Sequence, residues 1–174
     1  MSKIAIGTTQ FGIDYGINST SGQVKHREVV EILNYARTQN IGLLDTAPAY
    51  GNSEQVLGDA NTQDFKIVTK TRHFNQSVIG DKEANLVTSD LIQSLKSLKQ
   101  KSVYGVLVHN ADDLLKSGAD KLFKQLQILK QQGSISKIGV SIYTDSQLQK
   151  VIDRFSIDIV QLPFNILDNR LINS

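Results

Sequence analysis

Four polar side chains stand at or just after the ends of predicted β-strands. Asp45 ends the second strand, Lys70 the third and His109 the fourth, while Tyr50 lies five residues beyond Asp45 in a turn. Parallel strands bring their carboxyl ends to one face of a sheet, and ligands bind at that face. We therefore expect a carboxylate, an ammonium, an imidazole and a phenol at one mouth.

Such a set could deliver a proton to a carbonyl oxygen. A phenol has an ordinary pKa near ~10, and a lysine ammonium within ~4–6 Å favours the phenolate. A carboxylate would orient the ammonium, and a histidine could donate a hydrogen bond to a substrate carbonyl. Each residue taken alone also has a purely structural interpretation. Asp45 or Lys70 could be half of an ion pair, His109 could be a core histidine, and Tyr50 could be an aromatic residue packed in a turn. Only a source of hydride is lacking for reduction.

Short β-branched runs, which alternate with longer amphipathic segments, must position these residues. The predicted strands cover residues 4–7, 42–45, 66–70, 103–109, 137–141 and 157–162. Their nearly continuous apolar character is typical of parallel strands covered on both faces. Strict alternation predicts an α/β fold with a parallel sheet, either doubly wound or closed as a barrel. A complete (β/α)8 barrel needs ~250 residues, so 174 residues hold five to six units.

Helical spacing predicts the segments between the strands. The expected helices cover residues 29–36, 53–57, 91–98, 122–129 and 148–155. Ser89 is the expected N-cap of the third helix, residues 144–146 supply caps for the last, and Gly133 is expected to end the fourth. Residues 71–88 look like an extended polar loop.

The composition excludes several classes of function. Nineteen Lys and Arg against seventeen Asp and Glu give a net charge of +2, with no basic patch that would bind nucleic acid or a membrane. Without cysteine there is no thiolate nucleophile, zinc–thiolate site or iron–sulfur cluster, and the three histidines are too isolated for a metal site. Neither a membrane span nor a signal peptide is evident, so we expect a cytoplasmic protein.

Six motifs, in order, resemble those of the aldo-keto reductases. The segment 45–58, DTAPAYGNSEQVLG, is similar to the family signature D-T-A-x-x-Y-G-x-S-E-x-x-L-G. The other five are residues 7–12 (GTTQFG), 67–71 (IVTKT), 106–109 (VLVH), 138–141 (IGVS) and 160–165 (VQLPFN).

The resemblance implies an NADP(H)-dependent reductase on a (β/α)8 barrel, acting on an aldehyde, ketone or sugar. Tyr50 would be the general acid, Lys70 and Asp45 its tuning pair, and His109 the residue that orients the carbonyl. Thr8, Asp45, Ser141 and Gln161 would bind the cofactor. Ile142 stands where many members have an asparagine, and a Rossmann G-x-G-x-x-G is absent.

Against this family, residues 1–174 would be one incomplete barrel domain of about six β-α units that lacks the last two strands. We interpret the chain either as a fragment of a longer gene product or as a truncated protein, in both cases without the residues that clamp the adenosine 2′-phosphate. Open sheet edges then favour self-association. Two other functions stay open: a catalytically inactive binding or subunit module, and a lyase or isomerase that uses Lys70 as an imine-forming base. The second is weaker because imine formation needs a neutral lysine.

Overall fold

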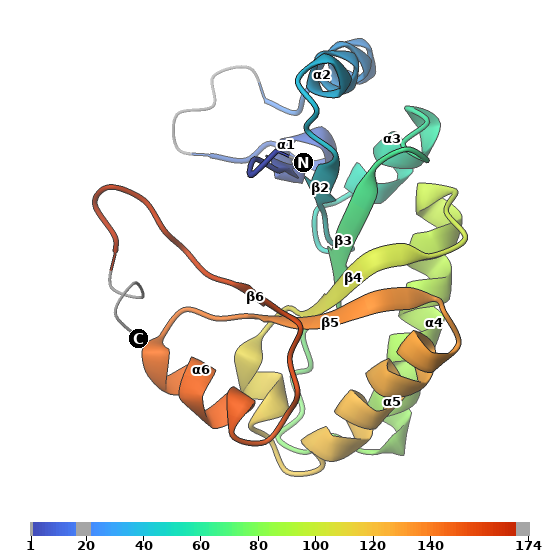
Figure 1. Ribbon diagram of the computed structural model, residues 1–174. Helices are drawn as coiled ribbons and strands as arrows, with labels where there is room; N and C mark the ends of the chain where they lie inside the picture. The colour runs from blue at the N-terminus through green and yellow to red at the C-terminus, as the bar shows by residue number, and fades with distance from the viewer. Residues whose placement is uncertain (1, 17–21, 170–174) are drawn as a thin grey trace. The chain divides into compact units, whose positions relative to one another are not determined.

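The computed structural model describes residues 2–16 and 22–169. These residues form two compact units, and we describe each unit by itself. Unit 1 comprises Met1–Lys70 and Leu91–Tyr104, and unit 2 comprises Thr71–Asp90 and Gly105–Ser174. Helix α4 (Asp81–Leu98) and strand β4 (Val103–Val108) are labelled in Figure 1. Each of them contributes residues to both units.

Unit 1 carries three parallel strands, β1 (Ile6–Gly7), β2 (Leu43–Asp45) and β3 (Lys66–Lys70). Gly7 of β1 is in register with Asp45, which is in register with Val68 of β3. Helices α1 (Thr9–Gly12), α2 (His26–Thr38) and α3 (Ser53–Asp59) complete this unit. The unit therefore holds the carboxyl ends of three consecutive strands and the turns that follow them.

Helix α2 shows why unit 1 folds in this way. Val29, Leu33 and Ala36 recur at helical spacing and are buried, so this face of the helix is removed from water. Strands β2 and β3 in turn bury Leu44 and Ile67. This apolar core holds the strands from which the candidate site projects.

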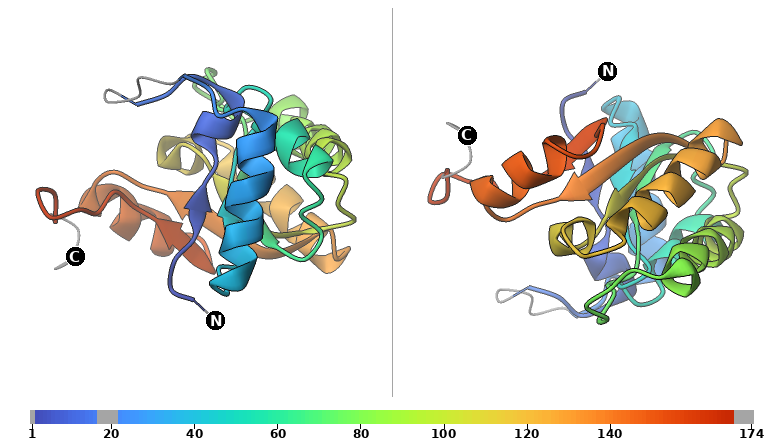
Figure 2. Two further views of the ribbon diagram at one scale, coloured as in Figure 1. Left: turned by 90° about the horizontal axis from the view of Figure 1, so that it is seen from above. Right: turned by 90° about the horizontal axis from the view of Figure 1, so that it is seen from below.

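Unit 2 begins with the β3–α4 loop and continues through η1 (Ala111–Leu114), α5 (Ala119–Gln131), β5 (Ile135–Ser141), α6 (Asp145–Ile152) and β6 (Ile159–Gln161). Strands β5 and β6 are parallel, with Ser141 in register with Gln161. Helix α5 packs along β5, and α6 contacts η1 (Figure 2). Gly133 has φ = 77° just after α5, and Thr144 caps α6 by accepting the Gln147 N–H, so both predicted helix ends are confirmed.

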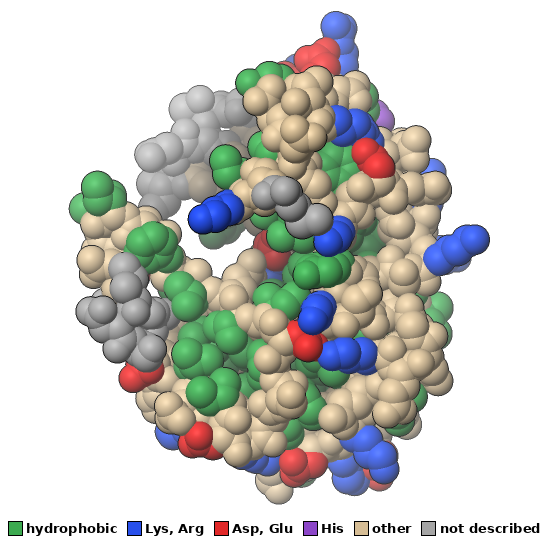
Figure 3. Space-filling model, viewed as in Figure 1, with side chains coloured by type: hydrophobic (Ala, Val, Ile, Leu, Met, Phe, Trp, Pro, Cys, Tyr) green, Lys and Arg blue, Asp and Glu red, His purple; other side chains and the backbone are tan. Residues whose placement is uncertain are grey.

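The end of unit 2 exposes apolar side chains. Ile166 and Leu167 are 95% and 94% exposed, and Phe164 is 62% exposed. Figure 3 shows one face of the molecule, on which hydrophobic side chains are coloured green. Exposed apolar residues are ordinary when they occur singly, and here three lie within four positions.

One part of the helix prediction is wrong. Helix α4 begins at Asp81, inside the segment expected to be an extended loop, and Ser89 lies within it rather than at its N-cap. The Glu83 carboxylate accepts the Gly80 N–H at 3.0 Å and so satisfies a free donor at the helix start. Ala84 and Val87 supply the buried face of the added turns.

The other predicted elements are confirmed with small shifts of their ends. All strand pairs within the units are parallel, and strand order follows chain order, as expected for successive β-α steps. Among the described residues, no helix combines the length and apolar character needed to cross a membrane. The same residues contain no cluster of three or more metal-ligating side chains.

Candidate active site

An ion pair between Asp45 and Lys70 lies at the carboxyl ends of β2 and β3. The Lys70 Nζ lies 2.7 Å from Asp45 Oδ1 and also donates to the Thr46 carbonyl at 3.1 Å. The Lys70 side chain is 1% exposed and that of Asp45 20%. An ammonium is buried at such a position only when partners compensate for its lost hydration. The Lys70 ammonium is therefore held in a fixed position at the edge of unit 1, with Asp45 as its counter-charge.

Tyr50 lies beside this charge. The Lys70 Nζ is 4.9 Å from the centroid of the Tyr50 ring, and the tyrosine is half-buried. The turn is closed by the Tyr50 N–H, which donates to the Ala47 carbonyl at 3.0 Å, and Gly51 follows with φ = 59°. Glycine is suited to that left-handed conformation because it has no Cβ.

Helix α1 touches the backbone of the same turn. A Cβ built on Gly12 would lie 1.7 Å from the Tyr50 carbonyl oxygen and 2.5 Å from the Ser53 nitrogen. A Cβ on Gly51 would lie 2.5 Å from the Gly12 carbonyl oxygen. The position of Tyr50 thus depends on two glycines that allow two backbones to touch.

Three buried hydroxyl groups hold the turn from below. The Ser53 hydroxyl lies 2.8 Å from Thr8 Oγ1 and 3.2 Å from Thr46 Oγ1, and the Thr8 hydroxyl donates to the Asp45 carbonyl at 3.0 Å. Thr8, Thr46 and Ser53 have no exposed surface. Because every hydroxyl has a partner, the network fixes α3 against the ends of β1 and β2. We refer to these three residues as the hydroxyl network.

Glu54 is a buried carboxyl next to this network. Its Oε1 accepts a hydrogen bond from the Thr69 hydroxyl at 2.7 Å, and the residue is 8% exposed. Burial raises the pKa of the Glu54 carboxyl, while hydrogen bonds from Thr69 and Ser94 act in the opposite direction. Glu54 therefore ties α3 to β3 directly beside Lys70.

Unit 2 carries the other predicted site residues. His109 directly follows β4, and its backbone N–H donates to Thr71 Oγ1 at 3.2 Å. Its ring packs edge-on against His73, with a centroid separation of 4.4 Å and an interplanar angle of 74°. Ser141 and Gln161 end adjacent strands at the same register, so their Cα atoms are separated by about one strand spacing, ~4.8 Å.

The structure thus brings Asp45, Lys70 and Tyr50 together in unit 1, with Thr8 buried beneath them. It brings Ser141 beside Gln161 in unit 2. Convergence of the two sets on one mouth, and the cofactor roles, stay predictions.

Four residues without a predicted role lie next to predicted site residues of their own unit. These are Gly12, Ser53, Glu54 and His73. Ser53 and Glu54 carried a usable signal, because two polar residues begin a helix directly after the Tyr50 turn.

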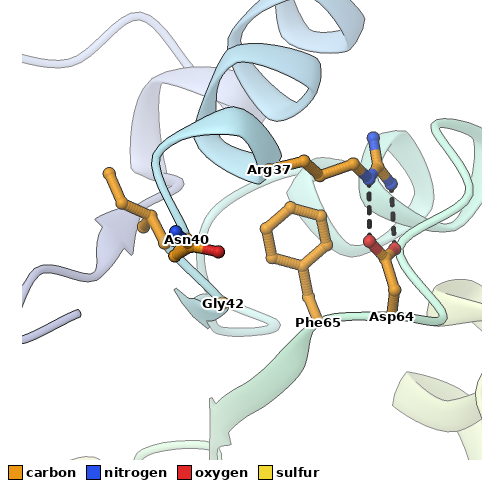
Figure 4. Close-up of a pocket in the computed structure, with 6 residues that line it drawn as sticks. Arg37, Asn40, Gly42, Asp64 and Phe65 are labelled. Carbon is orange, nitrogen blue, oxygen red and sulfur yellow. Dashed lines mark hydrogen bonds and ion pairs between the residues drawn. The ribbon is translucent and has the colours of Figure 1, made fainter. Parts of the chain in front are cut away.

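A cavity of about 550 Å³ lies elsewhere in unit 1, at the opposite ends of β2 and β3. Arg37 on α2 donates two hydrogen bonds to Asp64, at 2.8 and 2.9 Å, and lies over the Phe65 ring (Figure 4). Burial at this end of parallel strands usually serves stability rather than chemistry. We therefore assign this cavity a structural role.

The chain is similar in sequence to known proteins. The model of the Aldo/keto reductase family matches residues 3–174. The aldo-keto reductase YhdN of Bacillus subtilis (strain 168) is 27% identical over 187 residues, covering 98% of this chain and 52% of YhdN. The uncharacterized oxidoreductase YqkF of the same organism is 24% identical, covering 98% of this chain and 58% of its own length. The chain spans little more than half the length of these curated relatives.

Solved structures show the same fold. PA4992 from Pseudomonas aeruginosa superposes with a TM-score of 0.78 at 29% identity, covering 97% of this chain and 66% of that chain. Bombyx mori aldo-keto reductase, in complex with NADP, has a TM-score of 0.68 at 21% identity and covers 93% of this chain and 54% of that one. These likenesses confirm the predicted incomplete (β/α)8 barrel. The family match over nearly the whole sequence shows that this chain belongs to the aldo/keto reductase family of oxidoreductases.

Proposed function

We propose that this chain carries the proton-transfer half of an NADP(H)-dependent carbonyl reductase, with Tyr50 as the general acid. The observation that carries the proposal is the position of the Lys70 ammonium, 2.7 Å from Asp45 Oδ1 and 4.9 Å from the centre of the Tyr50 ring. The proposed substrate is an aldehyde, ketone or sugar carbonyl.

Lys70 would act on Tyr50 through its charge. When the phenol gives its proton to the carbonyl oxygen, negative charge develops on the tyrosine oxygen. A buried ammonium nearby stabilises that charge without reorienting, because Asp45 and the Thr46 carbonyl already hold it. His109, as the predicted carbonyl-orienting residue, would donate a hydrogen bond to the same oxygen.

The same contacts weigh against an imine mechanism. An amine that attacks a carbonyl must be neutral and free to move. The Lys70 nitrogen instead donates to a carboxylate and a backbone carbonyl, and its side chain is 1% exposed. Lys70 is therefore better suited to act as a fixed charge than as a nucleophile.

The donor set in unit 2 fits a nicotinamide group. Ser141 and Gln161 place a hydroxyl and a side-chain amide at one register of adjacent strands, and a carboxamide can pair with both. Ile142, fully buried, has no polar side-chain atom to add to this set. NADPH, when bound, supplies the hydride that reaches the carbonyl carbon.

The test combines cofactor binding with one substitution. Titration with NADPH, followed by nucleotide fluorescence, should show saturable binding. Tyr50→Phe should lower turnover of a simple aldehyde by about 10²–10⁴-fold because it removes the general acid. Tyr35→Phe, at an exposed tyrosine on α2, is the matched control and should leave turnover unchanged. Near wild-type turnover in Tyr50→Phe would refute the assigned role.

A non-catalytic module that pairs with a second copy of the chain is the second candidate. The exposed apolar residues Phe164, Ile166 and Leu167 after the edge strand β6 favour it. Absence of NADPH binding at millimolar concentration, together with a dimer by light scattering, would replace the first proposal with this one. A cytoplasmic location stays a prediction.

A further inference from the structure

His73 has no role in the proposed proton transfer, yet its ring lies against that of His109. The two centroids are 4.4 Å apart and the ring planes are inclined by 74°. This edge-on arrangement is one of the two favoured geometries for aromatic rings. His73 itself is exposed, so only its surroundings can explain why the ring is held there.

The segment before His73 is fixed to β4. The backbone N–H of Thr71 donates to the Leu107 carbonyl at 2.9 Å, and the Thr71 hydroxyl accepts the His109 N–H at 3.2 Å. Arg72 is paired with Asp90 of α4 through two hydrogen bonds, of 2.5 and 2.6 Å. The backbone on this side of His73 therefore has a defined position next to His109.

The segment after His73 is held by a buried ion pair. Phe74 is 4% exposed, and its N–H donates to Asp113 Oδ2 at 3.3 Å while its carbonyl accepts from the Lys116 ammonium. Lys116 Nζ lies 2.6 Å from Asp113 Oδ1, and the Asp113 side chain has no exposed surface. Asp113 of η1 and Lys116, two residues after the end of η1, thus bind both backbone polar groups of Phe74.

We propose that His73 is a positioning residue for His109. The anchors on both sides fix the backbone next to His73, and the His73 ring that packs against His109 then limits the orientations open to the His109 imidazole. A histidine that must aim one N–H at a carbonyl oxygen benefits from such a restraint, since small errors of orientation reduce rate strongly. The catalytic consequence rests on the function proposed above, whereas the ring restraint does not.

The test measures the NMR signal of the His109 ring directly. The chain has three histidines, so a protein labelled with ¹³C in the imidazole rings gives three ring Cε1–Hε1 signals. His26→Ala, at an exposed residue of α2, identifies one signal and should leave the other two in place. His73→Ala should remove its own signal and shift that of His109. His73→Phe, which keeps an aromatic ring, should return the His109 signal toward its wild-type position.

Kinetics with NADPH and benzaldehyde give the second readout. His73→Ala should lower kcat by about 10- to 100-fold with little change in KM, and His73→Phe should recover most of the loss. An unshifted His109 signal in His73→Ala, or unchanged kcat in an active protein, would overturn the inference. If the His109 signal shifts in His73→Ala but the wild-type chain shows no turnover, the proposed function is refuted and the ring restraint is supported. Thermal melts of each variant confirm that the fold is kept.

Discussion

Gly12→Ala tests how the Tyr50 turn is positioned. The added methyl would meet the Tyr50 carbonyl oxygen at 1.7 Å, whereas real Cβ contacts essentially never fall below 3.0 Å, so the two backbones must separate by more than 1 Å. Both contacting groups belong to the backbone and cannot rotate away. Overpacking of this kind costs about 1–3 kcal/mol of folding free energy. For a chain of this size, 1 kcal/mol corresponds to about 2–4 °C, so the melting temperature should fall by about 2–12 °C.

The assay is a circular dichroism melt paired with aldehyde turnover. Displacing Tyr50 from Lys70 by about 1 Å should lower turnover by about 100-fold. Gly42→Ala is the matched control, because a Cβ there meets nothing within 4 Å and both signals should stay at the wild-type level. A Gly12→Ala protein with wild-type melting temperature and wild-type turnover would refute the close-approach reasoning.

Three further predictions concern buried or paired charges. Asp45→Asn should destabilise the protein by about 3–5 kcal/mol in urea unfolding, because the buried Lys70 ammonium loses its partner; an effect below about 1 kcal/mol would contradict this. Burial raises the pKa of the Glu54 carboxyl in the folded protein above its ordinary value of 4.5. The folded state therefore binds this proton more tightly than the unfolded state, so the contribution of Glu54 to folding stability is complete below about pH 4.5 and is lost as the pH rises through the raised pKa. Melts should therefore show wild-type stability falling relative to Glu54→Gln as the pH rises above about 4.5, and parallel curves would argue against it. Arg37→Lys should cost no more than about 1 kcal/mol in urea unfolding, since the pair with Asp64 is partly exposed; a larger loss would mean that the pair is more shielded than its exposure indicates.

The strands could be predicted well from the sequence because each is a compact β-branched run. Lys66–Lys70 matches its predicted bounds, and Asp45 ends its strand as expected. The start of α4 is not predicted because its first turns are rich in charged residues. Ala84, which lies on the buried face, is too small to mark that face clearly in the hydrophobic pattern. A cap supplied by Glu83 to Gly80 carries a weaker sequence signal than a serine or threonine at the N-cap position.

The candidate site could be predicted only in its residue types. The positions of Asp45, Tyr50 and Lys70 at or just after predicted strand ends indicated one shared face, and the ion pair within unit 1 agrees with it. The close approach at Gly12 and the ring contact of His73 depend on segments far apart in the chain. Neither apolar periodicity nor a local motif reports such contacts, because both are properties of neighbouring residues only.

The hydroxyl network of Thr8, Thr46 and Ser53 contains no group that ionises. Acid, base or added salt will therefore leave this part of the support for the tyrosine-bearing turn largely unaltered, since neutral hydrogen bonds carry no net charge to titrate or screen. A bell-shaped rate profile or a salt effect would then report on the ionising side chains above the network rather than on movement of their scaffold.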